Sequence, residues 1–283
     1  MLGKLLKHEF TATGRIMLPI LGALTMVVLL ANVLIRFGDA LAERFNLVLV
    51  LFVLVVALAV IAVIAAEIMS IVVMVHRFYK NLLGPEGYLM HTLPVNVHQL
   101  VWSKLIVSAV WILVTNLVII LLGLLTLMII GRLNLGELFR SFPSWRQIVA
   151  VLGYHGISES SLVGTVVLFA CLIFLTILST CLHFYAAMAL GHMFSNNKVL
   201  MSVVFFIAIN VVFNILSSVL LVGLQLGLPG SPFSMMVGGS PLSSDALGFM
   251  NAMYGTTLAL EGVQAALMYL ATVYGLKKKL NLA

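Results

Sequence analysis

Charged side chains are what this chain of 283 residues has least of: Asp, Glu, Lys and Arg together make up 8% of it. A soluble domain usually carries about 25% of these residues. Hydrophobic residues make up 63% and gather in long uninterrupted runs. Because a run of about 20 apolar residues crosses the hydrocarbon core as a helix, the composition excludes an ordinary soluble fold and predicts a multi-pass membrane protein.

Several chemical motifs are also missing from the sequence. The two cysteines, Cys171 and Cys181, fall in one apolar run about 15 Å apart along a helix, too far for a disulfide within that helix. No GxxxxGK[ST] phosphate loop, HExxH motif or Cys/His metal spacing occurs. We therefore expect no ATPase or other enzymatic activity, no metal site and no cofactor in this chain.

Apolar runs long enough to span a membrane cover residues 16–35, 47–75, 97–130, 162–190, 199–228 and 254–276. None of them alternates between apolar and polar residues, as a membrane β-strand would. Helices are the remaining way to satisfy the backbone inside a bilayer. We expect an all-α membrane protein with six transmembrane helices, forming a single transmembrane domain over residues 1–283.

The basic residues predict the orientation, because Lys and Arg concentrate in cytoplasmic connections. Ten of the fifteen lie near one set of span ends: Lys4, Lys7, Arg15, Arg77, Lys80, Lys104, Lys198, Lys277, Lys278 and Lys279. The other five lie near the opposite ends: Arg36, Arg44, Arg132, Arg140 and Arg146. Both termini are therefore expected in the cytoplasm. The net charge of +6 is a topology signal, and we expect no nucleic-acid partner.

Two segments outside the spans are expected at the membrane surface. Residues 1–15 place leucines and Phe10 at helical spacing beside Lys4, Lys7 and Glu9, which predicts an interfacial helix. The alternative is a charged stop before the first span. Residues 229–253 are rich in Gly, Ser and Pro with almost no charge, which favours a re-entrant segment over a surface loop.

The cytoplasmic connection HRFYKNLLGPEGYLMHTLPVNVHQ, residues 76–99, has the most internal pattern. Gly84 and Pro85 are expected to end one helix and start another, and Pro94 is expected to end that second helix. Glu86 lies in the first turn of the second helix, where the helix dipole favours a negative charge. Residues 84–94 should thus form a short helix across the inner face, the alternative being an ordinary interfacial turn. Asn96, followed three residues later by Gln99, resembles a capping box for the third span.

Polar residues inside the spans are candidates for function, because they are costly in a bilayer. Glu67 lies in the second span, Asn210 and Asn214 lie one turn apart in the fifth, and Glu261 and Gln264 lie in the sixth. For the amides we expect hydrogen bonds between helices. For Glu67 a structural role and a transport role stay open. The scattered histidines are expected to be hydrogen-bonded packing residues.

The opening MLGKLLKHEF, the six-span layout and the segment NLLGPEGYLMHTLPVNVHQLVWSKLI resemble permease subunits of type-2 ATP-binding-cassette (ABC) exporters from bacteria. The pattern EGYL, then TLP, then SK carries this resemblance. SK is Ser103 and Lys104, and the EGYL and TLP residues belong to the segment 84–94. The resemblance implies a coupling helix over 84–94 that docks on a separate ATPase subunit through Glu86, Gly87, Tyr88, Leu89, Thr92, Leu93 and Pro94. Pro85 and His91 depart from the family's pattern, which puts the fine docking contacts in doubt.

The resemblance also implies alternating access, with ATP and Mg²⁺ bound to the partner ATPase and a second permease half beside this one. The location would be the bacterial plasma membrane, and the substrate path would be lined by the second and fifth spans. Glu67, Met201, Asn210 and Asn214 are the candidate path residues. The alternative is an ion-coupled carrier, or an accessory membrane subunit without ATP coupling. In a carrier Glu67 would be essential, and residues 84–94 would tolerate substitution.

Overall fold

The computed structural model describes residues 2–42, 46–84, 96–131, 136, 143–154, 157–194, 197–227 and 244–278. All regular structure within these residues is helical, which confirms the expected all-α class. The helices are α1 (Leu2–Ala42), α2 (Asn46–Phe78), α4 (Val97–Ile130), α6 (Trp145–Tyr154), α7 (Glu159–Gly191), α8 (Lys198–Gly227) and α10 (Ser244–Lys278). A five-residue π-helix, η1 (Tyr79–Leu83), directly continues α2.

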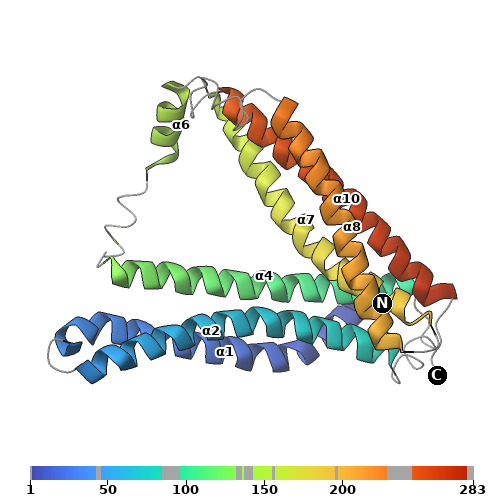
Figure 1. Ribbon diagram of the computed structural model, residues 1–283, viewed down its shortest axis with the longest axis horizontal. Coiled ribbons are helices and arrows are strands. Elements are labelled where there is room, and N and C mark those ends of the chain that lie inside the picture. Colours follow the sequence, from blue (N-terminus) through green and yellow to red (C-terminus); the bar gives the residue numbers. More distant parts are fainter. Residues whose placement is uncertain are drawn as a thin grey trace. The chain divides into compact units, whose positions relative to one another are not determined.

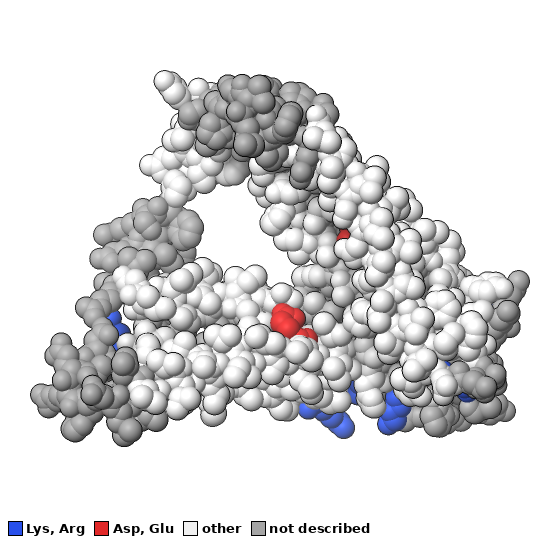
Figure 2. Space-filling view, in the orientation of Figure 1, with Lys and Arg blue, Asp and Glu red and all other residues white. Residues whose placement is uncertain are grey.

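Six of these helices, all except α6 and η1, are long and apolar enough to cross a membrane. The expected spans coincide with them: α4 begins and ends at the predicted residues, and the other runs lie inside their helices apart from residue 228, which is outside the described residues. Large apolar side chains such as Ile61 (64% exposed) and Val219 (66% exposed) point outward along the helices. Figure 2 shows mostly uncharged surface between sparse charged residues. These surfaces suit a lipid environment.

The sequence predicts one transmembrane domain, and the structure divides the chain into two compact units. The first unit is Met1–Leu82 with Leu89–Phe142, and the second is Leu83–Tyr88 with Pro143–Ala283. In the first unit α1 packs against both α2 and α4 (Figure 1). Its core joins Leu21, Leu24 and Val28 of α1 to Ala66 of α2 and Leu122 of α4. Burial of these aliphatic side chains holds the three helices together.

In the second unit α7 packs against α8 and α10 (Figure 1), and small residues allow the helices to approach closely. A Cβ atom added at Gly191 of α7 would lie 2.5 Å from the backbone nitrogen of Ser202 in α8. One added at Gly275 of α10 would lie 3.1 Å from the Cβ of Ala189 in α7. Small residues at such crossings are the usual way in which membrane helices gain packing contacts.

Residues 2–15, the expected interfacial segment, are helical and run into the first span without interruption, with Pro19 inside the same helix. Asn96 precedes α4 in an extended conformation, but its side chain makes no capping hydrogen bond, so the predicted capping box is wrong. The backbone carbonyl of Asn96 accepts from Gln99 and Leu100 instead. The side chain of Ser158 does cap α7, accepting from the amide of Ser161 at 3.3 Å.

Two expected segments fall largely outside the described residues. For the coupling helix over 84–94, only Gly84 is described. For the re-entrant segment over 229–253, residues 229–243 are outside the described part, while 244–253 form the beginning of α10. Both expectations remain predictions from the sequence.

Candidate functional site

A polar pocket lies between α7, α8 and α10 in the second unit, with a cavity volume of about 270 Å³. Six of its nine polar side chains come in pairs at helical spacing, so each pair shares one face of its helix. The pairs are Ser179 and His183 from α7, Asn210 and Asn214 from α8, and Glu261 and Gln264 from α10. Three apolar helices thus turn a polar stripe toward one cavity.

His183 connects α7 with α10 at this pocket. Its Nδ1 lies 2.8 Å from the backbone carbonyl oxygen of Ser179, and its Nε2 contacts the amide nitrogen of Gln264. A carbonyl oxygen only accepts, so Nδ1 carries the proton and donates. The contact of Nε2 with the Gln264 amide links α7 to α10.

Each of the two asparagines of α8 donates one of its two amide hydrogens to the backbone of its own helix. Asn210 Nδ2 donates to the backbone oxygen of Phe206 at 2.8 Å, and Asn214 Nδ2 donates to that of Asn210 at 2.8 Å. The expected hydrogen bonds between helices are therefore replaced by bonds within α8. The side-chain oxygens of both amides are left as acceptors at the pocket.

Glu261 is the only acidic residue among those that line this pocket, and the lining includes no Lys or Arg. Its Oε2 atom is buried and has no hydrogen-bond partner in the described part of the chain. An ionised carboxylate is expensive to bury without a compensating charge or hydrogen bond. Burial of the Glu261 carboxylate therefore favours the binding of a positively charged ligand in the pocket.

The structure brings together only part of the predicted substrate path. Asn210 and Asn214 line the pocket, but Met201, on the same helix, does not. Glu67 belongs to α2 in the first unit, where it is partly buried and its backbone oxygen accepts from Ser70 at 2.8 Å. The predicted coupling residues, from Glu86 to Pro94, lie outside the described residues.

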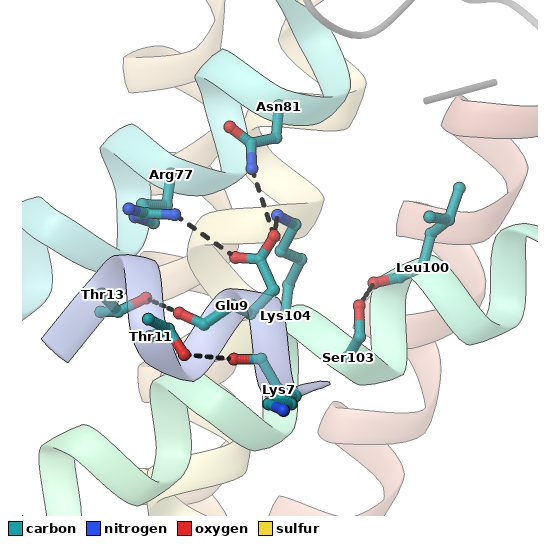
Figure 3. Close-up of polar contacts among 9 residues, drawn as sticks. All are labelled: Lys7, Glu9, Thr11, Thr13, Arg77, Asn81, Leu100, Ser103 and Lys104. Atoms are coloured by element: carbon teal, nitrogen blue, oxygen red, sulfur yellow. Dashed lines mark hydrogen bonds and ion pairs between the residues drawn. The ribbon is translucent and has the colours of Figure 1, made fainter. Parts of the chain in front are cut away.

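A separate cluster of charged side chains is buried in the first unit, around Glu9 (Figure 3). The Glu9 carboxylate of α1 forms an ion pair with Lys104 of α4, and both residues are buried. Arg77 of α2 lies 3.7 Å from Glu9 Oε2, and Asn81 of η1 donates to Oε1 at 3.3 Å. One carboxylate thus joins all three long helices of the unit.

Sequence reasoning placed Glu9 on the polar face of a surface helix and missed this cluster. The available signal was Lys104, a cation a few residues inside an apolar run, which needs a buried partner. The cluster also brackets the predicted coupling segment. Asn81 precedes residues 84–94 and Lys104 follows them, so the Glu9 carboxylate holds the described chain on both sides of that segment.

The described residues thus present a polar pocket within three of the potential membrane-spanning helices and a buried ion cluster within the other three. The pocket is suited to binding a small molecule, and the cluster is suited to fixing helix positions. Comparison with protein-family models, with curated proteins and with solved structures gives no match to this chain.

Proposed function

We propose that this chain is the permease subunit of an ABC exporter, forming half of a substrate path and driven by a separate ATPase subunit. The observation that carries the proposal is the sequence pattern EGYL and TLP between the second and third apolar helices, followed by SK near the start of the third. Six helices long and apolar enough to cross a membrane agree with it. So does a polar pocket among three of those helices, where a transported molecule could bind.

The buried ion cluster suggests how movement of an ATPase would reach the helices. In the proposal the partner pushes on residues 84–94, through Glu86, Leu89 and their neighbours. Both chain segments that flank this region are tied to Glu9, by Asn81 on one side and Lys104 on the other. A push would therefore move α1, the end of α2 and the start of α4 together. A second permease half, identical or different, completes the path.

Co-purification tests the proposal. The tagged chain is extracted in mild detergent from its native host, and a stoichiometric ATPase subunit is expected with it. Glu86→Ala and Leu89→Asp should abolish that association, because both residues lie in the predicted docking segment. Glu159→Ala, at the start of α7 and with an exposed side chain, is the matched control and should retain the ATPase. An ATPase that survives both docking variants, or is absent from folded wild type, contradicts the proposal.

An ion-coupled carrier is the second candidate, and the unpartnered Oε2 of Glu261 is the observation that favours it. Carboxylates inside membrane segments often serve in proton or ion pathways. A carrier would transport in vesicles that contain no ATPase, driven by an ion gradient. Its activity would be lost in Glu261→Gln or Glu67→Gln and kept in Glu86→Ala. The exporter predicts the opposite result for Glu86→Ala.

A further inference from the structure

The pocket between α7, α8 and α10 is rich in side-chain oxygen atoms that can accept hydrogen bonds. Besides the two asparagines, Ser217 donates to the backbone oxygen of Phe213 at 2.8 Å and Thr257 donates to that of Met253 at 2.8 Å. The two hydroxyl hydrogens and one amide hydrogen of each asparagine are thus used within their own helices, while all four side-chain oxygens retain lone pairs. Such a lining attracts a ligand that donates hydrogen bonds or carries positive charge.

The charge balance of the pocket points the same way. Glu261 contributes a carboxylate, and the lining residues from all three helices include no Lys or Arg. Both ring nitrogens of His183 are engaged, by Ser179 and by Gln264. A positively charged ligand would compensate the charge of the carboxylate and so reduce the cost of burying it.

Aromatic rings complete the lining. Phe184 of α7 and Phe206 of α8 stack with ring centroids 4.5 Å apart, and Phe213 meets the His183 ring edge-on at 6.3 Å. Faces of aromatic rings attract ammonium groups and also bury apolar surface. At about 270 Å³ the cavity is far larger than a bare metal ion and close to the lower end of small-molecule sites.

We propose that this pocket is a binding site for a small amphipathic organic cation, with Glu261 as its counter-charge and the phenylalanine rings around its apolar part. The proposal names a ligand class for the transport path, and it rests on the proposed function only in calling that ligand a substrate. Binding itself requires the chain alone.

The test compares two probes of similar size and opposite charge, phenethylammonium and 3-phenylpropionate. The full-length chain is placed in nanodiscs of uncharged phosphatidylcholine, and binding is measured by equilibrium dialysis against empty nanodiscs. We expect saturable binding of phenethylammonium and none of 3-phenylpropionate. Glu261→Gln should weaken phenethylammonium binding at least tenfold. Glu159→Gln, which removes an exposed carboxylate at the start of α7 and outside the pocket lining, should leave it unchanged.

A second measurement covers the case in which Glu261→Gln does not fold. Ser217→Cys, in a Cys171→Ala background, places a thiol at the pocket, and phenethylammonium should slow its reaction with maleimide while 3-phenylpropionate does not. Equal binding of both probes, no binding by wild type, or unchanged binding in folded Glu261→Gln would overturn the assignment. Because no ATPase is present, a failure here is separate from a failure of co-purification, and either result can occur without the other.

Discussion

At the scale of single residues, the Glu9 carboxylate contacts side chains of three residues, Arg77, Asn81 and Lys104. It is 7% exposed and its partner Lys104 is 4% exposed, so neither is effectively hydrated. A buried ion pair is weak evidence of net stabilisation, because desolvation opposes the attraction. Removing one partner is different, since the other charge then stays buried without compensation.

We therefore expect Glu9→Gln to destabilise the folded chain by about 3–5 kcal/mol, because it leaves the Lys104 ammonium buried and unneutralised. The thermal unfolding midpoint in detergent measures this loss. The double variant Glu9→Gln with Lys104→Met is the control and should recover most of the stability. A single variant as stable as wild type would show that the ion pair contributes nothing to the fold.

His192 follows the last residue of α7 and lies outside the membrane-spanning segment. It is buried, and its Nδ1 lies 2.9 Å from the Met188 carbonyl oxygen. Burial lowers the pKa of His192 below its usual 6.5, and the positive charge of Lys198 adds to this, while the hydrogen bond to Met188 partly opposes it. The folded chain therefore favours the neutral ring.

Stability should consequently fall in mildly acidic solution. Above pH 6.5 the ring is neutral in both the folded and the unfolded chain, and its contribution is fully present. As the pH drops below 6.5, the unfolded chain takes up the proton first, and stability decreases until the folded pKa is passed. The unfolding midpoint over a pH series measures this. In His192→Gln the slope between pH 6.5 and the lowered pKa should become shallower, and an unchanged slope would refute the assignment.

The sequence drew attention individually to four of the nine polar residues of the pocket but did not group them. Asn210, Asn214, Glu261 and Gln264 stand out because they interrupt apolar runs. Helical spacing shows that residues share a face, yet it does not tell which faces of different helices meet. Glu9 was hidden for the same reason, because its partners lie 72 and 95 positions away along the chain.

At the scale of helices, span positions could be read from the sequence because long apolar runs set them directly. The continuation of residues 2–15 into the first span and the π-helical turn of η1 could not. The first segment carries Glu9 with its buried contacts, and the second carries Asn81, which reaches that carboxylate. These contacts join residues far apart along the chain, and local sequence patterns do not record them.

The crossing of α7 and α8 gives a prediction for these helices. Gly191→Ala places a Cβ against the Ser202 backbone, which cannot move aside as a flexible side chain would. We expect a destabilisation of about 1–3 kcal/mol, typical of overpacking. Gly164→Ala, in the same helix with nothing within 4 Å of its added Cβ, is the matched control. It should be neutral or stabilising by up to about 1 kcal/mol. Equal unfolding midpoints for the two variants would contradict the close approach.

At the scale of the whole molecule, six apolar helices and the distribution of basic residues predict both termini on the cytoplasmic side. Tyr154 at the end of α6 is 89% exposed and should then face outward, whereas the exposed Lys277 near the end of α10 should face inward. A membrane-impermeant maleimide should label Tyr154→Cys in intact cells. It should label Lys277→Cys only after permeabilisation. The parent chain with its natural cysteines is the control, and the reverse pattern would invert the topology.

Pro19 has a mechanical consequence for the long first helix. Proline has no amide hydrogen, so the carbonyl oxygen of Arg15 loses the bond that any other residue at that position would give it. On one side of this missing bond the helix is held by the ion pair of Glu9, and on the other by Leu21 and the apolar core. The helix is therefore held by contacts on both sides of the missing hydrogen bond. Any rotation of one held segment relative to the other should be concentrated in the turn at Pro19, which would act as the hinge of the first unit.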